Sequence, residues 1–116
     1  MVEQNSKLNH IQLELSTRKQ IENEQWQEKL QTLTSTSRGR SAAIAIHGMT
    51  IVENKQFDSV IYDPILKGND ILLVLEGFIQ MVNEPMEVYI TNDTNGVVST
   101  LEILGQNGEL TILRLI

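Results

Sequence analysis

From residue 42 onward, short apolar runs alternate with residues that favour tight turns, and this punctuation constrains the fold most strongly. Asn-Gly occurs twice, at residues 95–96 and 107–108. A two-residue type I′ turn requires positive φ at both central positions, which Asn and Gly tolerate. We therefore predict a mainly antiparallel β domain, a small sandwich or barrel. The candidate strands are Ala42–Ile46, Met49–Glu53, Phe57–Tyr62, Ile71–Val82, Met86–Thr91, Val97–Leu104 and Glu109–Ile116.

Treating each Asn-Gly as a two-residue turn sets the register of the last three strands. One turn places residue 90 opposite residue 101 and residue 88 opposite residue 103, and the other places residue 103 opposite residue 112. A slip by one residue would scramble the faces, so a uniformly apolar face supports this register. Arg114 is predicted to lie opposite Leu101. The predicted core face consists of Val88, Ile90, Leu101, Ile103, Leu110 and Ile112.

The strand predicted around residues 71–75 is apolar on both of its faces, which is typical of a strand buried on both sides. Gly77, followed by Phe78, predicts a bulge or bend that redirects the second half of the segment. More than one face of the sheet thus requires burial, yet only 75 residues follow residue 41. We expect association between subunits to supply the remaining cover.

The segment from Asn5 to Leu33 contains neither Gly nor Pro and is rich in good helix formers. It predicts one long amphipathic helix of roughly 43 Å at 1.5 Å per residue. A β domain of this size should be only about 30 Å across. Two interpretations remain: a helix that pairs between subunits, which we favour, or a break near Ser16–Thr17 that folds the helix back. The apolar stripe consists of Leu8, Ile11, Leu15, Trp26, Leu30 and Leu33.

The predicted fold class is therefore α+β, with a long N-terminal helix followed by an antiparallel β domain. We expect residues 1–34 to form a helical stalk or docking arm, residues 35–41 a linker, and residues 42–116 the β domain. The six residues of the apolar stripe are the candidate interaction residues, with Trp26 as a packing anchor. Because polar residues interrupt the middle of the stripe, the expected coiled coil lacks a regular heptad seam.

Charge is distributed unevenly along the chain. Residues 1–40 carry six basic and five acidic residues, whereas residues 41–116 carry three basic and ten acidic ones. A surface this acidic repels phosphate backbones, so we expect no nucleic-acid partner. Arg38 and Arg40 lie in a Ser/Thr-rich stretch and form a candidate anion contact. Arginines in such a linker are more often simply solvated.

Groups that carry out chemistry are scarce. The chain has no cysteine, which excludes disulfides, thiolate zinc sites and cysteine nucleophiles. Its two histidines are too few for a His-rich metal centre within one chain. Its seven glycines form no phosphate-binding loop, and the acidic residues show no spacing that would fix them as a catalytic pair. We therefore expect neither an enzyme nor a bound cofactor or metal.

These features favour a non-enzymatic, homo-oligomeric assembly or interaction protein, a layout that resembles fibre or coat components of phages and spores at the level of fold only. One alternative is a small acidic binding or inhibitor protein that engages a basic partner protein. Another is a small-molecule binder at a subunit interface. The first ten residues contain no apolar core of signal-peptide length, and no apolar run approaches a membrane span. We expect a cytoplasmic or particle-associated protein, not secreted by a classical signal and without a membrane partner.

Overall fold

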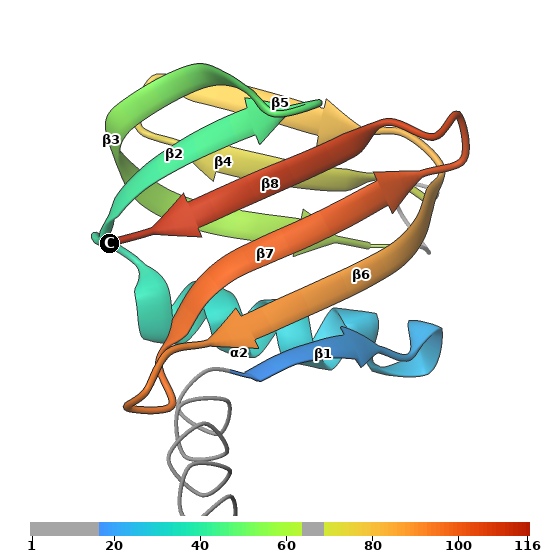
Figure 1. The fold of residues 1–116 in the computed structure, drawn as a ribbon, viewed down its shortest axis with the longest axis horizontal. Coiled ribbons are helices and arrows are strands. Elements are labelled where there is room, and N and C mark those ends of the chain that lie inside the picture. The colour runs from blue at the N-terminus through green and yellow to red at the C-terminus, as the bar shows by residue number, and fades with distance from the viewer. Residues whose placement is uncertain (1–16, 64–68) are drawn as a thin grey trace, which may run out of the picture.

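The computed structural model describes residues 17–63 and 69–116. Within these residues, eight strands form one antiparallel sheet in the order β1-β6-β7-β8-β2-β3-β4-β5 (Figure 1). The helical elements are the 3-10 helix η1 (Asn23–Gln25) and the α-helix α2 (Trp26–Ser37). The strands are β1 (Thr17–Ile21), β2 (Ser41–Ile46), β3 (Met49–Tyr62), β4 (Ile71–Leu75), β5 (Phe78–Val82), β6 (Pro85–Asn92), β7 (Val98–Gly105) and β8 (Leu110–Leu115).

The long strand β3 connects two layers of the sheet. Its first part pairs with β2, and its last part, from Phe57 to Tyr62, pairs with β4. The register shifts between Phe57 and Ser59, so Asp58 lies in a β-bulge, a feature that bends a strand. The two strands predicted at residues 49–53 and 57–62 are therefore one. Strands β1, β6, β7, β8 and β2 form one layer, and the end of β3 with β4 and β5 forms the other (Figure 1).

Helix α2 lies along the open side of the folded sheet, near β1 and the end of β3 (Figure 1). Its buried apolar residues Trp26, Leu30 and Leu33 follow one another at helical spacing and face the sheet. They join one core with residues of the strands. The other core residues are Ile21, Ala42, Ile44, Phe57, Val60, Ile71, Leu73, Leu75, Val82, Val88, Leu101, Ile103, Leu113 and Leu115.

The prediction of one long N-terminal helix, and with it the α+β class and the coiled coil, is wrong. Residues 17–21 form a strand that pairs with β6, and α2 begins only at Trp26. The chain is extended at Glu22, with φ −64° and ψ 147°, and the indole Nε1 of Trp26 donates to the carbonyl oxygen of Ile21 at 2.9 Å. Pairing with β6 thus overrides the helix propensity of this segment. The expectation of a mainly antiparallel β domain fits the structure.

The predicted register is confirmed in one hairpin and wrong in the other. Ile90 lies opposite Leu101 and Val88 opposite Ile103, as predicted. In the second hairpin, Ile103 lies opposite Thr111 instead of Ile112, so Leu110 and Ile112 leave the core face. Arg114 accordingly lies opposite Thr100.

The loop between β7 and β8 explains this slip. The Gly105 amide donates to the carbonyl of Glu109 at 2.9 Å, which leaves three residues, Gln106 to Gly108, at the tip of the hairpin. Gly108 has φ +86°, and Asn107 does not have positive φ. This is a three-residue loop with glycine in the left-handed region, the next most common hairpin connection. The extra loop residue reverses the two faces of β8.

None of the helices within residues 17–63 and 69–116 combines the length and the apolar composition needed to span a membrane.

Candidate functional site

The residues predicted to form an interaction stripe are divided between two parts of the chain. Leu8, Ile11 and Leu15 lie outside the described residues. Trp26, Leu30 and Leu33 are buried in the core of the same chain, each no more than 2% exposed. Trp26 also packs edge-on against Tyr62, with ring centroids 5.3 Å apart. These three side chains hold α2 on the sheet and are not available to a partner.

The two arginines of the predicted anion contact are used separately. Arg40 donates from its guanidinium to the carbonyl oxygens of Val98, at 2.7 Å, and Leu115, at 3.3 Å. It thereby ties the chain after α2 to β7 and β8. Arg38 is exposed, and its Nε donates to the carbonyl oxygen of Asp58 at 3.0 Å. Since Arg40 is committed to backbone carbonyls, the structure does not bring the pair together around one anion.

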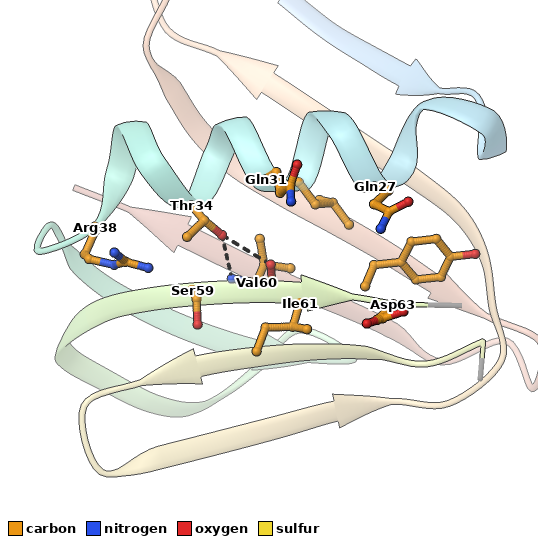
Figure 2. A pocket seen from close by; sticks show the side chains of 10 residues that line it. Gln27, Gln31, Thr34, Arg38, Ser59, Val60, Ile61 and Asp63 are labelled. Atoms are coloured by element: carbon orange, nitrogen blue, oxygen red, sulfur yellow. Dashed lines mark hydrogen bonds between the residues drawn. The ribbon is translucent and has the colours of Figure 1, made fainter. Parts of the chain in front are cut away.

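Arg38 borders a hollow of about 370 Å³ between α2 and the last residues of β3 (Figure 2). Gln27, Gln31 and Thr34 line it from the helix. The opposite wall is formed by Ser59, Val60, Ile61, Tyr62 and Asp63. Thr34 bridges the two walls, because its Oγ1 donates to the carbonyl oxygen of Val60 at 3.2 Å and accepts from its amide at 3.0 Å. The hollow is open to solvent, and its lining combines polar and apolar side chains.

Beside this hollow lies an apolar surface on the outward side of β3, β4 and β5. The register places Ile61 opposite Leu72, Leu72 opposite Met81, and Val74 opposite Ile79. Ile79 is 63% exposed, Met81 48% and Ile61 39%, while Leu72 and Val74 are half-buried. We call these five residues the apolar face. Neither β4 nor β5 contains a charged residue.

The apolar face ends at a free edge of the sheet. Among residues 17–63 and 69–116, β5 is the last strand in the sheet order and pairs only with β4. An edge strand presents unpaired N–H and C=O groups to which another chain can add, and natural proteins usually protect such edges with charges or proline. β5, with the sequence FIQMV, has neither. The candidate functional site is therefore the apolar face together with the edge of β5.

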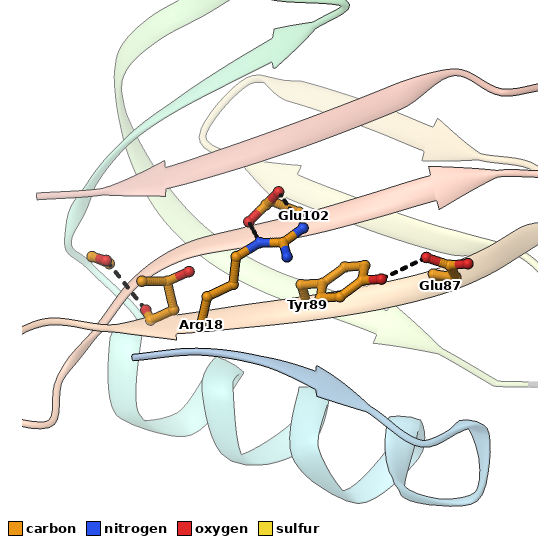
Figure 3. A network of polar contacts seen from close by, with 6 residues as sticks. Arg18, Glu87, Tyr89 and Glu102 are labelled. Carbon is orange, nitrogen blue, oxygen red and sulfur yellow. Dashed lines mark hydrogen bonds and ion pairs between the residues drawn. The ribbon is translucent and has the colours of Figure 1, made fainter. Parts of the chain in front are cut away.

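At the other end of the sheet, the outward surface of β1, β6 and β7 is polar (Figure 3). Arg18 makes two hydrogen bonds to the carboxylate of Glu102, at 2.8 and 3.1 Å, and its guanidinium lies 3.8 Å from the ring centroid of Tyr89. The Tyr89 hydroxyl donates to Glu87 Oε1 at 2.7 Å. These contacts link three strands across the surface.

The same contacts raise the pKa values of Arg18 and Tyr89. The hydrogen bonds to Glu102 raise the pKa of Arg18 further above its usual value. The hydrogen bond to Glu87 raises the pKa of Tyr89, because ionisation would place two negative charges side by side. Arg18 thus stays charged and Tyr89 neutral near neutral pH. We interpret this network as a clasp that fixes β1 to the sheet.

The sequence contained a partial signal for the candidate site. The apolar character of both sides of the segment around residues 71–75 indicated a second surface that needs burial. In the structure, Ile71, Leu73 and Leu75 are buried in the core, and Leu72 and Val74 face outward. The sequence does not reveal the free edge, because its pattern predicts one strand with a bend over residues 71–82, whereas residues 76 and 77 form a hairpin loop between β4 and β5. Within the part of the chain that the structure describes, no three His, Cys, Asp or Glu residues are grouped to hold a metal ion.

Comparison with known families gives one match, to the family of unknown function DUF5335, over residues 17–116. The chain belongs to DUF5335. The matched region begins at the first residue of β1, so the family unit includes β1 and α2 as well as the strands that follow. No curated protein and no solved structure matches this DUF5335 chain significantly.

Proposed function

We propose that this DUF5335 chain is a non-enzymatic assembly protein that associates with copies of itself through the apolar face and the free edge of β5. One observation carries the proposal: the two ends of the same sheet have outward surfaces of opposite character. Over β1, β6 and β7 the surface bears Arg18, Glu87, Tyr89 and Glu102 in mutual contact. Over β4 and β5 it bears only apolar side chains and no charge.

An exposed apolar surface of this kind favours association. Soluble monomers rarely expose contiguous apolar patches larger than a few hundred Å², and patches of that kind generally mark sites of interaction. Transfer of such side chains from water into an interface contributes roughly 25 cal/mol per Å² of apolar area before the entropy lost on association is subtracted. Ile79 and Met81 contribute most here, because they are the most exposed residues of the apolar face.

The surroundings of the apolar face also suit an interface. Polar side chains border it on the side of the hollow, among them Gln31 from α2, Arg38 directly after α2 and Ser59 from β3. Protein interfaces commonly combine an apolar centre with a polar, hydrated rim. An open hollow of mixed polarity serves better as part of such a rim than as an enclosed pocket for a small ligand.

The test is the mass of the protein in solution, measured by light scattering after size exclusion over a range of concentrations. We expect an oligomer for the natural chain and a lower mass for Met81→Lys, because an amine in the apolar centre must be desolvated on association. Thr100→Lys, on the polar surface of β7, is the matched control and should keep the natural mass. A natural chain that remains monomeric at tens of micromolar, or an oligomer that Met81→Lys leaves intact, would contradict the proposal.

A further inference from the structure

The free edge of β5 also indicates how two copies join, an inference that rests on the proposed self-association. We propose that β5 pairs with β5 of a second copy in antiparallel orientation, with Gln80 on the two-fold axis. The sheets of the two copies then continue into one.

The hairpin between β4 and β5 determines which backbone groups are free. Two residues, Glu76 and Gly77, separate the paired residues Leu75 and Phe78. The pair that flanks a two-residue loop is hydrogen-bonded, and hydrogen-bonded pairs then recur at every second position. Phe78, Gln80 and Val82 therefore direct their backbone groups toward β4, and the intervening residues direct theirs toward the free edge.

The free groups thus belong to Ile79 and Met81. A hydrogen bond at this edge agrees with the assignment, since the side-chain amide of Gln80 donates to the carbonyl oxygen of Met81 at 3.2 Å. A neighbouring side chain here occupies the acceptor that a partner strand would use. A partner strand that binds at this edge displaces the Gln80 side chain from the Met81 carbonyl. It then pairs with the N–H and C=O groups of Ile79 and Met81.

Two copies of β5 complement each other in one register. With Gln80 on the axis, Ile79 of each copy lies opposite Met81 of the other, and both pairs can exchange N–H···O=C bonds. Phe78 lies opposite Val82 on the inner side, so all five residues are paired. A two-fold axis through Ile79 or Met81 would leave strand residues unpaired at one end. An isologous joint of this type closes at a dimer and does not propagate into a fibre.

The strand itself carries no charge that would oppose pairing with a second copy, and the charges beyond its ends distinguish a copy from a basic partner by their response to salt. β5 contributes no charged residue to the joint, so nothing in the strand attracts a basic peptide or repels an identical strand. The nearest acidic residues, Glu76 and Glu84, lie beyond its two ends, and the proposed register brings Glu76 of each copy near Glu84 of the other. This repulsion is weakened by salt. We therefore expect added salt to strengthen the dimer, whereas it would weaken a complex with a basic protein.

Cysteine cross-linking tests the register directly, because the chain contains no cysteine of its own. Gln80→Cys places two thiols opposite each other in a non-hydrogen-bonded pair, with Cα atoms about 4.5 Å apart. That separation permits a disulfide. Ile79→Cys is the matched control on the same strand, since its two copies would be diagonal neighbours roughly 7–8 Å apart. Mild oxidation should give a covalent dimer at least several-fold faster for Gln80→Cys than for Ile79→Cys.

Three outcomes would overturn this inference, and the first two leave the proposed function in place. A natural chain that is oligomeric while neither cysteine variant cross-links would exclude the edge joint but leave self-association in place. Faster cross-linking of Ile79→Cys would show another register. A monomeric natural chain would exclude both proposals. Circular dichroism and the fluorescence of Trp26, the single tryptophan, verify that each variant is folded.

Discussion

Thr34 performs for the edge of β3 the role that a neighbouring strand performs elsewhere in the sheet. Its hydroxyl lies 3.0 Å from the amide nitrogen of Val60 and 3.2 Å from the carbonyl oxygen of the same residue. One helical side chain thus satisfies both backbone groups of a buried strand residue. The edge of β5 has no comparable cover from the helix, which is why that edge, and not the edge of β3, is the candidate joint.

Replacing Thr34 with valine keeps the shape of the side chain but removes both hydrogen bonds. The amide and carbonyl of Val60 would then remain buried without a partner, and each such group costs about 1–3 kcal/mol. We expect Thr34→Val to lower the free energy of unfolding by about that amount, measured by urea denaturation with Trp26 fluorescence. Thr32→Val is the matched control, because Thr32 is exposed on the same helix. Equal stability of the two variants would show that the contact with Val60 contributes little.

Arg40 connects the chain after α2 with two strand ends, so its loss should weaken the attachment of the helix. The guanidinium reaches carbonyls on both β7 and β8, at Val98 and Leu115. Lysine cannot form the same forked contact. We expect Arg40→Lys to reduce the free energy of unfolding by about 1–3 kcal/mol.

The exposed Arg38 supplies the comparison for this prediction. It contacts Asp58 at the surface, with 3.8 Å between Nε and the carboxylate, and both side chains are more than half exposed. Surface ion pairs contribute little to stability. Arg38→Lys should therefore change denaturation much less than Arg40→Lys, and the reverse order would contradict the structural role of Arg40.

The hydrogen bond between Tyr89 and Glu87 predicts a pH dependence at the alkaline end. It raises the pKa of Tyr89 in the folded chain, so the folded state keeps the phenolic proton at a pH where the unfolded state loses it. The stabilising contribution is complete below the unfolded pKa of about 10 and disappears as the pH rises through the folded value. Unfolding should accordingly become easier above that range.

Absorbance of the ionised phenol measures this pKa directly. The chain has two tyrosines, so the change Tyr62→Phe leaves Tyr89 as the single reporter. In that background we expect Tyr89 to ionise above its ordinary pKa, and Glu87→Gln to lower the pKa because the negative acceptor is removed. If Glu87→Gln left the titration of Tyr89 unchanged, the hydrogen bond would not be its cause.

The limits of prediction are clearest in the hairpins. Both Asn-Gly pairs form three-residue loops, with an amide-to-carbonyl bond from Asp93 to Val97 in one and from Gly105 to Glu109 in the other. In the first hairpin, a register shift between Thr91 and Asn92 compensates for the extra loop residue. The second has no such shift between Thr100 and Leu110, and its predicted faces are reversed. A bulge depends on packing along the whole strand, so local sequence does not reveal it.

The helix shows the same balance between local pattern and tertiary contact. The spacing of Trp26, Leu30 and Leu33 predicted one apolar face, and the structure buries that face against the sheet of the same chain and not against a partner. Helix propensity alone predicted that the helix also includes Thr17–Ile21. In the structure, this segment instead pairs with β6 along its whole length and is held by the hydrogen bonds of Arg18 to Glu102. The sequence does not reveal the candidate joint on β5 for a similar reason. The order of strands in a sheet depends on the topology of the whole chain, so no single segment shows that it forms an edge.

Gly108 offers a test of the loop that reverses β8. Its φ of +86° lies in the left-handed region, and a Cβ atom added there would meet no atom within 4 Å. Any penalty must therefore come from backbone conformation and not from a clash. A β-branched residue is strained at such a φ, so Gly108→Val should lower the free energy of unfolding by roughly 1–2 kcal/mol. Asparagine tolerates this region, so Gly108→Asn is the matched control and should cost clearly less in the same urea titration. Equal losses for valine and asparagine would show that the loop does not depend on positive φ at residue 108.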